Sequence, residues 1–250
     1  MSISKIGTRT YTLCMRELLS YFSSPLAYIL TALFIFLLGW NFFNSLVLTK
    51  DNPNIELTES LITPIFVNIN FLFLIVAPLL TMRSFAEEKK EKTLDLLFTS
   101  CLSDMEILLG KFLSVLGVSL FMISLSFIFP FMLFLSGYSD WSILLTSYAG
   151  TILNISSYLM IGLFLGSLTQ NQILSALLTF CVLIFLLLLA HSVNFITNPY
   201  LANWISFISI ANHFQSFSIG VVNTSDILYY LCTILFFAFL THRSLGARKW

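Results

Sequence analysis

The chain has 250 residues, of which 58% are hydrophobic and only 10% are charged. Its formal net charge is zero, from 12 basic and 12 acidic residues. A soluble domain carries about 25% charged residues, so this composition disfavours a soluble enzyme. A nucleic-acid-binding protein would show a basic excess, and a disordered chain would combine low hydrophobicity with high net charge, so both classes are excluded.

Long uncharged segments indicate helices that span a membrane. No Asp, Glu, Lys or Arg occurs in the 85 residues 141–225, and residues 18–49, 60–82 and 112–139 are also uncharged. A helix crosses the hydrocarbon core with about 20 mainly apolar residues, and backbone groups in lipid must pair internally. The sequence therefore predicts an all-α polytopic membrane protein with six transmembrane helices: Leu26–Val47, Leu61–Met82, Ile107–Leu135, Ile143–Leu168, Ile173–Phe195 and Asp226–Thr241. Pro130 predicts a kink or tilt in the third span.

The basic residues predict the orientation of these spans. With six spans, eleven of the 12 Lys and Arg residues fall on one side of the membrane, and only Lys50 falls on the other. Lys and Arg concentrate in cytoplasmic loops, so both termini are expected in the cytoplasm. The first span continues into Trp40-Asn41-Phe42-Phe43 without a small-residue cleavage site, which predicts a retained anchor rather than a cleaved signal peptide.

Two segments on the predicted cytoplasmic side have helical character. Residues 8–24 combine a loose apolar stripe with Arg9, Arg16 and Glu17, which favours an interfacial helix along the membrane surface. Residues 83–106 connect the second and third spans and carry ten of the 24 charged residues. Two interpretations of this charged, amphipathic connection remain open: a solvated link between spans, or a docking surface for a cytoplasmic partner.

The predicted outer side carries an unusual segment at residues 196–225. It has no charged residue, yet its Asn, Ser, His and Gln content makes it too polar for a plain span. Trp and Phe are interleaved with these polar residues, which predicts a re-entrant segment of short helices at the outer interface, covered by protein.

The chain carries no sequence pattern for an ATP, metal or catalytic site. Gly110-Lys111 is followed by Phe112 and lacks the upstream glycine of a phosphate-binding loop, so the chain cannot bind ATP in that manner. No His-Glu-x-x-His or Cys-x-x-Cys occurs, and none of the three histidines has a carboxylate partner nearby in sequence. No cofactor, metal site or enzymatic activity is therefore expected of this chain.

Three motifs in a fixed order carry a resemblance to a known family. Arg83-Ser84-Phe85-Ala86-Glu87-Glu88, then Thr93-Leu94-Asp95-Leu96-Leu97, then Gly110-Lys111 resemble the signature of type-2 ABC exporter permeases. The chain departs from that signature at Lys92, where the family usually has Gly, and in 99–103, which lack the usual Pro. The segment from Asn212 to Gly220, followed by Asp226 and Tyr229-Tyr230, resembles the gliding-motility branch of this family.

The resemblance implies a single permease domain over residues 1–250, in a bacterial inner membrane, that works with a cytoplasmic ATP-binding subunit holding the ATP and Mg. It also implies a second permease copy or homologue as dimer partner, leaves room for an accessory protein on the outer face, and involves no nucleic acid. The following residues would couple the permease to the ATPase: Glu87, Glu88, Lys89, Thr93 and Asp95. Arg83 and Lys111 would flank them at the membrane surface, and the outer segment would contribute His213, Phe214, Phe217 and Gly220. The alternative is a membrane scaffold of a motility or secretion machine that moves no small solute.

Overall fold

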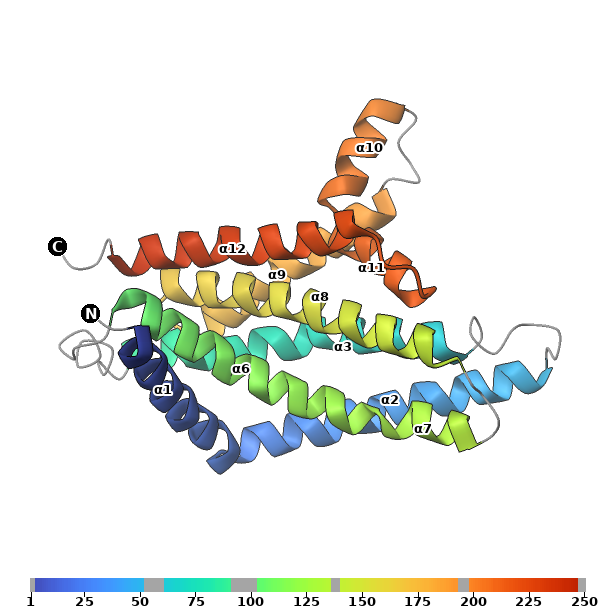
Figure 1. The fold of residues 1–250 in the computed structure, drawn as a ribbon, viewed down its shortest axis with the longest axis horizontal. Coiled ribbons are helices and arrows are strands. Elements are labelled where there is room, and N and C mark those ends of the chain that lie inside the picture. Colours follow the sequence, from blue (N-terminus) through green and yellow to red (C-terminus); the bar gives the residue numbers. More distant parts are fainter. Residues whose placement is uncertain (1–2, 52–60, 91–102, 136–139, 193–197, 247–250) are drawn as a thin grey trace.

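The computed structural model describes residues 3–51, 61–90, 103–135, 140–192 and 198–246. Long helices run side by side along one axis of the molecule (Figure 1). Six helical segments are long and apolar enough to cross a membrane, as the sequence predicts. They are formed by α2 (Pro25–Asp51), α3 (Thr63–Met82), α6 with α7 (Asp104–Ser126 and Ile128–Leu135), α8 (Trp141–Leu168), α9 (Gln172–Ser192) and α12 (Thr224–Gly246).

The observed spans agree with the predicted ones to within a few residues, and the last is longer than predicted. It was expected over Asp226–Thr241 and extends over Thr224–Gly246, so it has the length of a full span. The last turns of this helix contain polar and charged residues. A prediction from hydropathy therefore ends the span too early. The start of α1 (Ile3–Ser23) and the end of α12 lie at the same end of the bundle (Figure 1), here called the terminal end; the opposite end is called the far end.

The third span is interrupted where α6 ends and α7 begins. Proline lacks a backbone N–H, so Pro130 cannot donate to the carbonyl four residues earlier, that of Ser126. Helical bonding resumes with the Phe131 amide, which donates to the Phe127 carbonyl at 3.0 Å. The third span is therefore interrupted about one turn before the proline, next to the Ser126 carbonyl to which the proline cannot donate; the kink or tilt itself stays a prediction.

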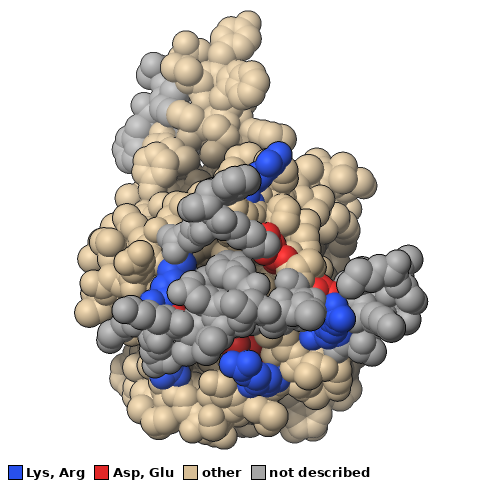
Figure 2. All heavy atoms as spheres, turned by 90° about the vertical axis from the view of Figure 1, so that its left-hand side faces the viewer, with Lys and Arg blue, Asp and Glu red and all other residues tan. Residues whose placement is uncertain are grey.

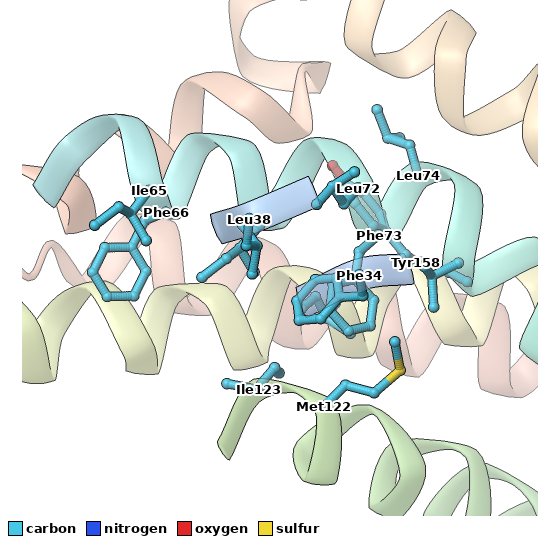
Figure 3. Packing of buried hydrophobic residues seen from close by; sticks show 14 of the residues in the cluster. Phe34, Leu38, Ile65, Phe66, Leu72, Phe73, Leu74, Met122, Ile123 and Tyr158 are labelled. Atoms are coloured by element: carbon cyan, nitrogen blue, oxygen red, sulfur yellow. The ribbon is translucent and has the colours of Figure 1, made fainter. Parts of the chain in front are cut away.

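Interlocking aromatic and aliphatic side chains from α2, α3, α6 and α8 form the core (Figure 3). Phe34 of α2 meets Phe73 of α3 edge to face, with ring centroids 5.3 Å apart. The Asn154 side-chain amide of α8 donates to the Asn70 side-chain oxygen of α3 at 2.8 Å. This polar pair joins two spans inside the apolar core, where few alternative hydrogen-bond partners compete.

Small residues set the closest approach between spans. A Cβ atom added at Gly162 of α8 would overlap the Thr81 side chain of α3, and one at Gly166 would come within 3.3 Å of the Ser175 hydroxyl of α9. The Gly162-x-x-x-Gly166 pattern thus allows α8 to pack against two neighbours at once. α9 and α12, in contrast, leave most of their apolar side chains at least partly exposed at the surface of the molecule.

Replacing Gly162 with Ala is expected to destabilise the bundle by about 1–3 kcal/mol, because the added methyl group must displace Thr81. The thermal midpoint of the detergent-solubilised protein would fall by several degrees. Gly39→Ala is the matched control, because the nearest heavy atom to an added Cβ there lies at an ordinary 3.7 Å. Equal midpoints for the two variants would contradict this account of the α3–α8 contact.

Candidate functional site

A buried cluster of charged side chains lies at the terminal end, where α1, α6 and the residues after α3 meet. Lys111 of α6 is fully buried. Its Nζ lies 2.7 Å from Oε1 of Glu88 and 3.6 Å from Oε1 of Glu17 in α1. The same ammonium donates to the Ser84 carbonyl at 2.6 Å and lies 5.2 Å from the centre of the Phe85 ring.

This arrangement compensates a charge that would otherwise be costly to bury. An ammonium removed from water is tolerated only when carboxylates, carbonyls or aromatic faces replace its hydration. Lys111 obtains all three kinds of partner from two other parts of the chain. The Lys111 side chain is inaccessible to solvent, whereas Glu17 and Glu88 each keep 14% of their side-chain surface exposed. Solvent therefore reaches the cluster from the side of the two glutamates.

The start of α6 fixes where Lys111 lies. Ser103 accepts a hydrogen bond from the Glu106 amide, and the Glu106 carboxylate accepts one from the Ser103 amide at 2.7 Å. This capping box begins the helix at Asp104, about two turns before Lys111. Next to Lys111, Gly110 lets Leu13 of α1 approach so closely that a Cβ at position 110 would overlap it.

α3 ends in a π-helical turn, η2 (Arg83–Glu87), followed by the short helix α4 (Glu88–Lys90). Such a turn interrupts the regular bonding of an α-helix and is frequent at functional sites. The Tyr21 hydroxyl of α1 donates to the Leu80 carbonyl at 2.9 Å and lies 3.0 Å from the Ser84 hydroxyl. Arg83 donates to the hydroxyl of Ser24, the residue after α1, at 2.7 Å, so α1 and the turn that follows it are both bound to the start of η2.

Lys89 binds the neighbouring span on the other side. Its ammonium donates to the carbonyls of Gly166 at 3.3 Å, Ser167, and Thr169 at 3.1 Å, which lie at the C-terminal end of α8. The last carbonyls of a helix lack helical partners and carry partial negative charge, which suits a cation. The consecutive residues Glu88 and Lys89 therefore connect one short segment to α6 through Lys111 on one side and to α8 on the other.

The buried position changes the acidity of Glu88. Desolvation raises the pKa of its carboxyl above the ordinary value of 4.5, and the Lys111 ammonium opposes this rise. Glu17 repels the charged form and raises the pKa further, whereas Arg16 lowers it. Figure 2 looks onto the terminal end and shows acidic and basic side chains gathered around its centre, inside a largely uncharged rim.

Several predicted site residues are placed by the structure, and others are not described. Thr93 and Asp95 lie outside the described residues, and Glu87 is placed only as the last residue of η2. Lys111, expected as a flank at the membrane surface, is fully buried at the centre of the cluster. Glu17, Tyr21 and Ser84 were not singled out from the sequence, because their contacts join positions 27 to 94 residues apart.

The residues predicted for the outer segment lie in or directly after two short helices, α10 (Pro199–Ile208) and α11 (Ile210–Ser218). Phe214 and Phe217 are buried in the core, and Phe217 packs where Gly150 of α8 has no side chain. Gly220 has a φ of 84°, a left-handed conformation that glycine adopts without strain. It follows α11 and lets the chain turn beside Ile143.

No histidine has a carboxylate close to it in sequence, but the fold brings a distant carboxylate into contact with His213. His213 Nδ1 lies 2.7 Å from Oδ1 of Asp226, a residue 13 positions further along the chain. The two residues lie on different helices, so the i,i+4 spacing of a single helix could not predict the pair. Within the described parts of the chain, no group of three or more His, Cys, Asp and Glu side chains could hold a metal ion.

Residues 11–242 match the family described as ABC-2 family transporter protein. The chain belongs to the ABC-2 family. The match includes all six apolar helices almost completely, together with η2, α4 and the α10–α11 region. No curated protein matched the chain in a sequence search. Membrane subunits of the ABC-2 family work with a cytoplasmic ATP-binding subunit and are not typically catalytic themselves, so this chain is a multi-pass permease subunit of an ABC transporter.

Removing the Lys111 charge is expected to loosen the terminal end. Lys111→Met should lower stability by about 1–3 kcal/mol, because Glu88 and Glu17 lose their shared partner. Adding Glu88→Gln to this variant should recover part of the loss, since an uncharged amide tolerates the apolar replacement better than a carboxylate. Thermal midpoints of the two single variants and the double variant give the coupling energy. Strictly additive effects would show that Lys111 and Glu88 do not interact.

The same variants should differ in their response to pH. In Lys111→Met, burial acts on Glu88 without the opposing ammonium, so the pKa of the folded-state carboxyl is expected to rise above that of the wild type. A raised folded-state pKa contributes stability that is present below the unfolded value of 4.5 and is lost as pH rises through the folded value. The stability of Lys111→Met should therefore fall more steeply above pH 4.5 than that of Glu88→Gln/Lys111→Met. Parallel pH profiles would contradict the assigned cause of the pKa shift.

Proposed function

We propose that this chain is the membrane-spanning subunit of an ATP-driven exporter in a bacterial inner membrane. The observation that carries this proposal is the family match over residues 11–242. In the proposed orientation the terminal end faces the cytoplasm, where the ATP-binding subunit is available. The distribution of basic residues supports this orientation, because Lys50 is the only one of the 12 Lys and Arg residues in the sequence assigned to the opposite side.

Segment 83–106 is the proposed docking element for the ATP-binding subunit. This role is supported by its high charge, its position between two spans, and the contacts made by its first residues. A partner that moves α4 would act on Lys111 of α6 through Glu88, and on α8 through Lys89. Glu87, Thr93 and Asp95 are proposed to face the ATPase, whereas Arg83 and Lys111 hold the segment against the bundle.

Such a connection can couple nucleotide binding by the ATPase to the arrangement of the spans, without an ATP site in the permease. If segment 83–106 makes different contacts with the ATP-bound and nucleotide-free partner, it favours one arrangement of α6 and α8 in each state. By linkage, a substrate that favours one of these arrangements changes the affinity of the ATPase for nucleotide by the same factor. Substrate-stimulated ATPase activity is therefore the expected property of the assembled transporter.

A second permease copy or a homologue is proposed to complete the transport path. Six spans of this size make a poor enclosed pathway alone. α3 and α9 are the proposed lining elements, by analogy with the family. In a single subunit α9 is more open to contact with a second subunit than α3. Only 17% of the apolar stretch of α9 is buried, against 67% for the span that contains α3.

The test is co-expression with the ATP-binding protein encoded beside this chain, followed by mild extraction and reconstitution. A stable complex whose ATPase activity differs from that of the soluble partner alone would support the permease proposal. An outward-directed flux, measured with inside-out vesicles and ATP outside, would support the exporter direction. A complex-free chain, or a complex that leaves ATPase activity unchanged, would refute the coupling proposal and favour the scaffold interpretation.

Charge reversal at Glu87 is expected to weaken docking while leaving the internal cluster in place. A single reversed contact worth about 1.4 kcal/mol lowers ATPase affinity about tenfold, measured as the partner concentration that gives half-maximal ATPase stimulation. Glu59→Lys, the same change in the loop predicted on the opposite side, is the matched control and should behave like the wild type. Equal partner affinity for Glu87→Lys and Glu59→Lys would remove Glu87 from the docking surface.

A further inference from the structure

The far end contains a histidine whose two ring nitrogens both face hydrogen-bond acceptors. His213 lies in α11 and is 9% exposed. Its Nδ1 lies 2.7 Å from Oδ1 of Asp226 in α12, and its Nε2 lies 3.0 Å from the carbonyl oxygen of Phe207 in α10. One imidazole ring therefore joins three helices that are consecutive in the chain.

A neutral imidazole cannot satisfy both contacts with an ionised carboxylate. A carbonyl oxygen only accepts, and so does a carboxylate, whereas neutral histidine has one N–H and one bare nitrogen. Both contacts are satisfied when the ring carries two protons. The outcome is the same if the proton of the Nδ1 contact resides on the carboxyl: the pair holds one proton more than a neutral histidine beside a carboxylate.

Two neighbours favour the charged form of the ring. Tyr229 of α12 stacks on it, with ring centroids 3.9 Å apart and an interplanar angle of 19°. A cation over an aromatic face is attracted by the electrons of that face. The Phe207 carbonyl belongs to the last turn of α10, and the C-terminal end of a helix carries partial negative charge that stabilises an imidazolium.

The acidic and basic groups around His213 are few. Among the residues that the structure describes, Asp226 is the only acidic or basic side chain in direct contact with it, and Tyr229 and Tyr230 are its other titratable neighbours. The elements packed around α11, namely α3, α8, α9 and α10, contain no Asp, Glu, Lys or Arg. Their titratable side chains are Tyr148, Tyr158, Cys181, His191 and Tyr200.

The ring holds a junction that lies over a large apolar cavity. The Tyr229 hydroxyl donates to the Ile208 carbonyl at 2.6 Å, and the Tyr230 hydroxyl donates to the Ile210 carbonyl at 3.1 Å. Together with His213, these bonds attach the α10–α11 junction to α12. Phe207 and Tyr229 also line a cavity of about 900 Å³ between α9 and α12. Releasing the junction would therefore change one wall of that cavity.

We propose that His213 and Asp226 form a proton-dependent latch that keeps the α10–α11 junction closed against α12. The closed junction holds the additional proton, and the open junction releases it. Since the closed form binds one proton more than the open form, raising the pH shifts the junction toward the open form. The dependence on one proton is at most about tenfold in the closed-to-open ratio per pH unit.

The protonation state can be tested directly. The sequence has three histidines, so His191→Gln/His242→Gln leaves His213 as the sole histidine. Nitrogen-15 chemical shifts of labelled histidine distinguish an imidazolium from either neutral tautomer. The expected result at neutral pH is protonation of both ring nitrogens, or a proton shared between Nδ1 and the carboxyl. A neutral ring with one bare nitrogen beside an ionised Asp226 carboxylate at neutral pH would overturn the proposal.

The opening can be tested by thiol labelling in a background without the four native cysteines. Ser209→Cys places a thiol at a position that is fully buried between α10 and α11, and exposed Ser142→Cys reports the intrinsic pH dependence of the reaction. The ratio of the two maleimide labelling rates should rise with pH by up to about tenfold per unit. Adding His213→Gln or Asp226→Asn should give a high ratio at every pH.

His191→Gln is the matched control for this measurement, because it removes an exposed histidine from α9 and leaves the latch intact. It should reproduce the pH profile of the parent protein. A parent ratio that does not change with pH, or a His213→Gln profile that follows the parent, would refute the latch. None of these readouts requires an ATPase or a transported substrate, so they fail or succeed independently of the proposed function.

Discussion

The terminal end depends on compensating the charge of Lys111 inside an apolar bundle. Burial of this ammonium requires the Glu88 carboxylate and the Ser84 carbonyl from the segment after α3, with Glu17 of α1 nearby. Because each partner belongs to a different element, one electrostatic requirement fixes how α1, η2, α4 and α6 meet. A buried ion pair of this kind is not strong evidence for high stability, since desolvation offsets much of the attraction. It does specify which partners must come together.

The far end follows the same physical rule with other groups. His213 is placed between the Asp226 carboxylate and a helix-terminal carbonyl, and Tyr229 covers the ring. Between the two ends, the bundle is held by close packing at Gly162 and by the Asn70–Asn154 pair. Polar contacts therefore concentrate where the chain turns between spans. These are also the places where a bound partner or a proton can act on several helices at once.

The six spans could be predicted because hydrocarbon thickness sets a minimum length of apolar helix, and charged residues within it are costly. The interruption of the third span near Pro130 follows from the missing N–H of proline, and the close contact at Gly162-x-x-x-Gly166 follows from the absence of side chains. The partners of Lys111 could not be predicted in this way. Glu17, Ser84 and Glu88 are separated from it by 94, 27 and 23 residues, and no local periodicity relates such distant positions.

Sequence alone determined that this protein is a helical membrane protein, where its spans lie, and that one connection carries ten of the 24 charged residues. These properties depend on composition and on short-range patterns, which hydropathy and chain length express directly. Only the tertiary structure decided that Lys111 is a buried centre, that Lys89 binds the end of α8, and that His213 pairs with Asp226. Those contacts depend on how helices are rotated and packed, because the same side chain is solvated or buried according to the neighbour its helix face meets.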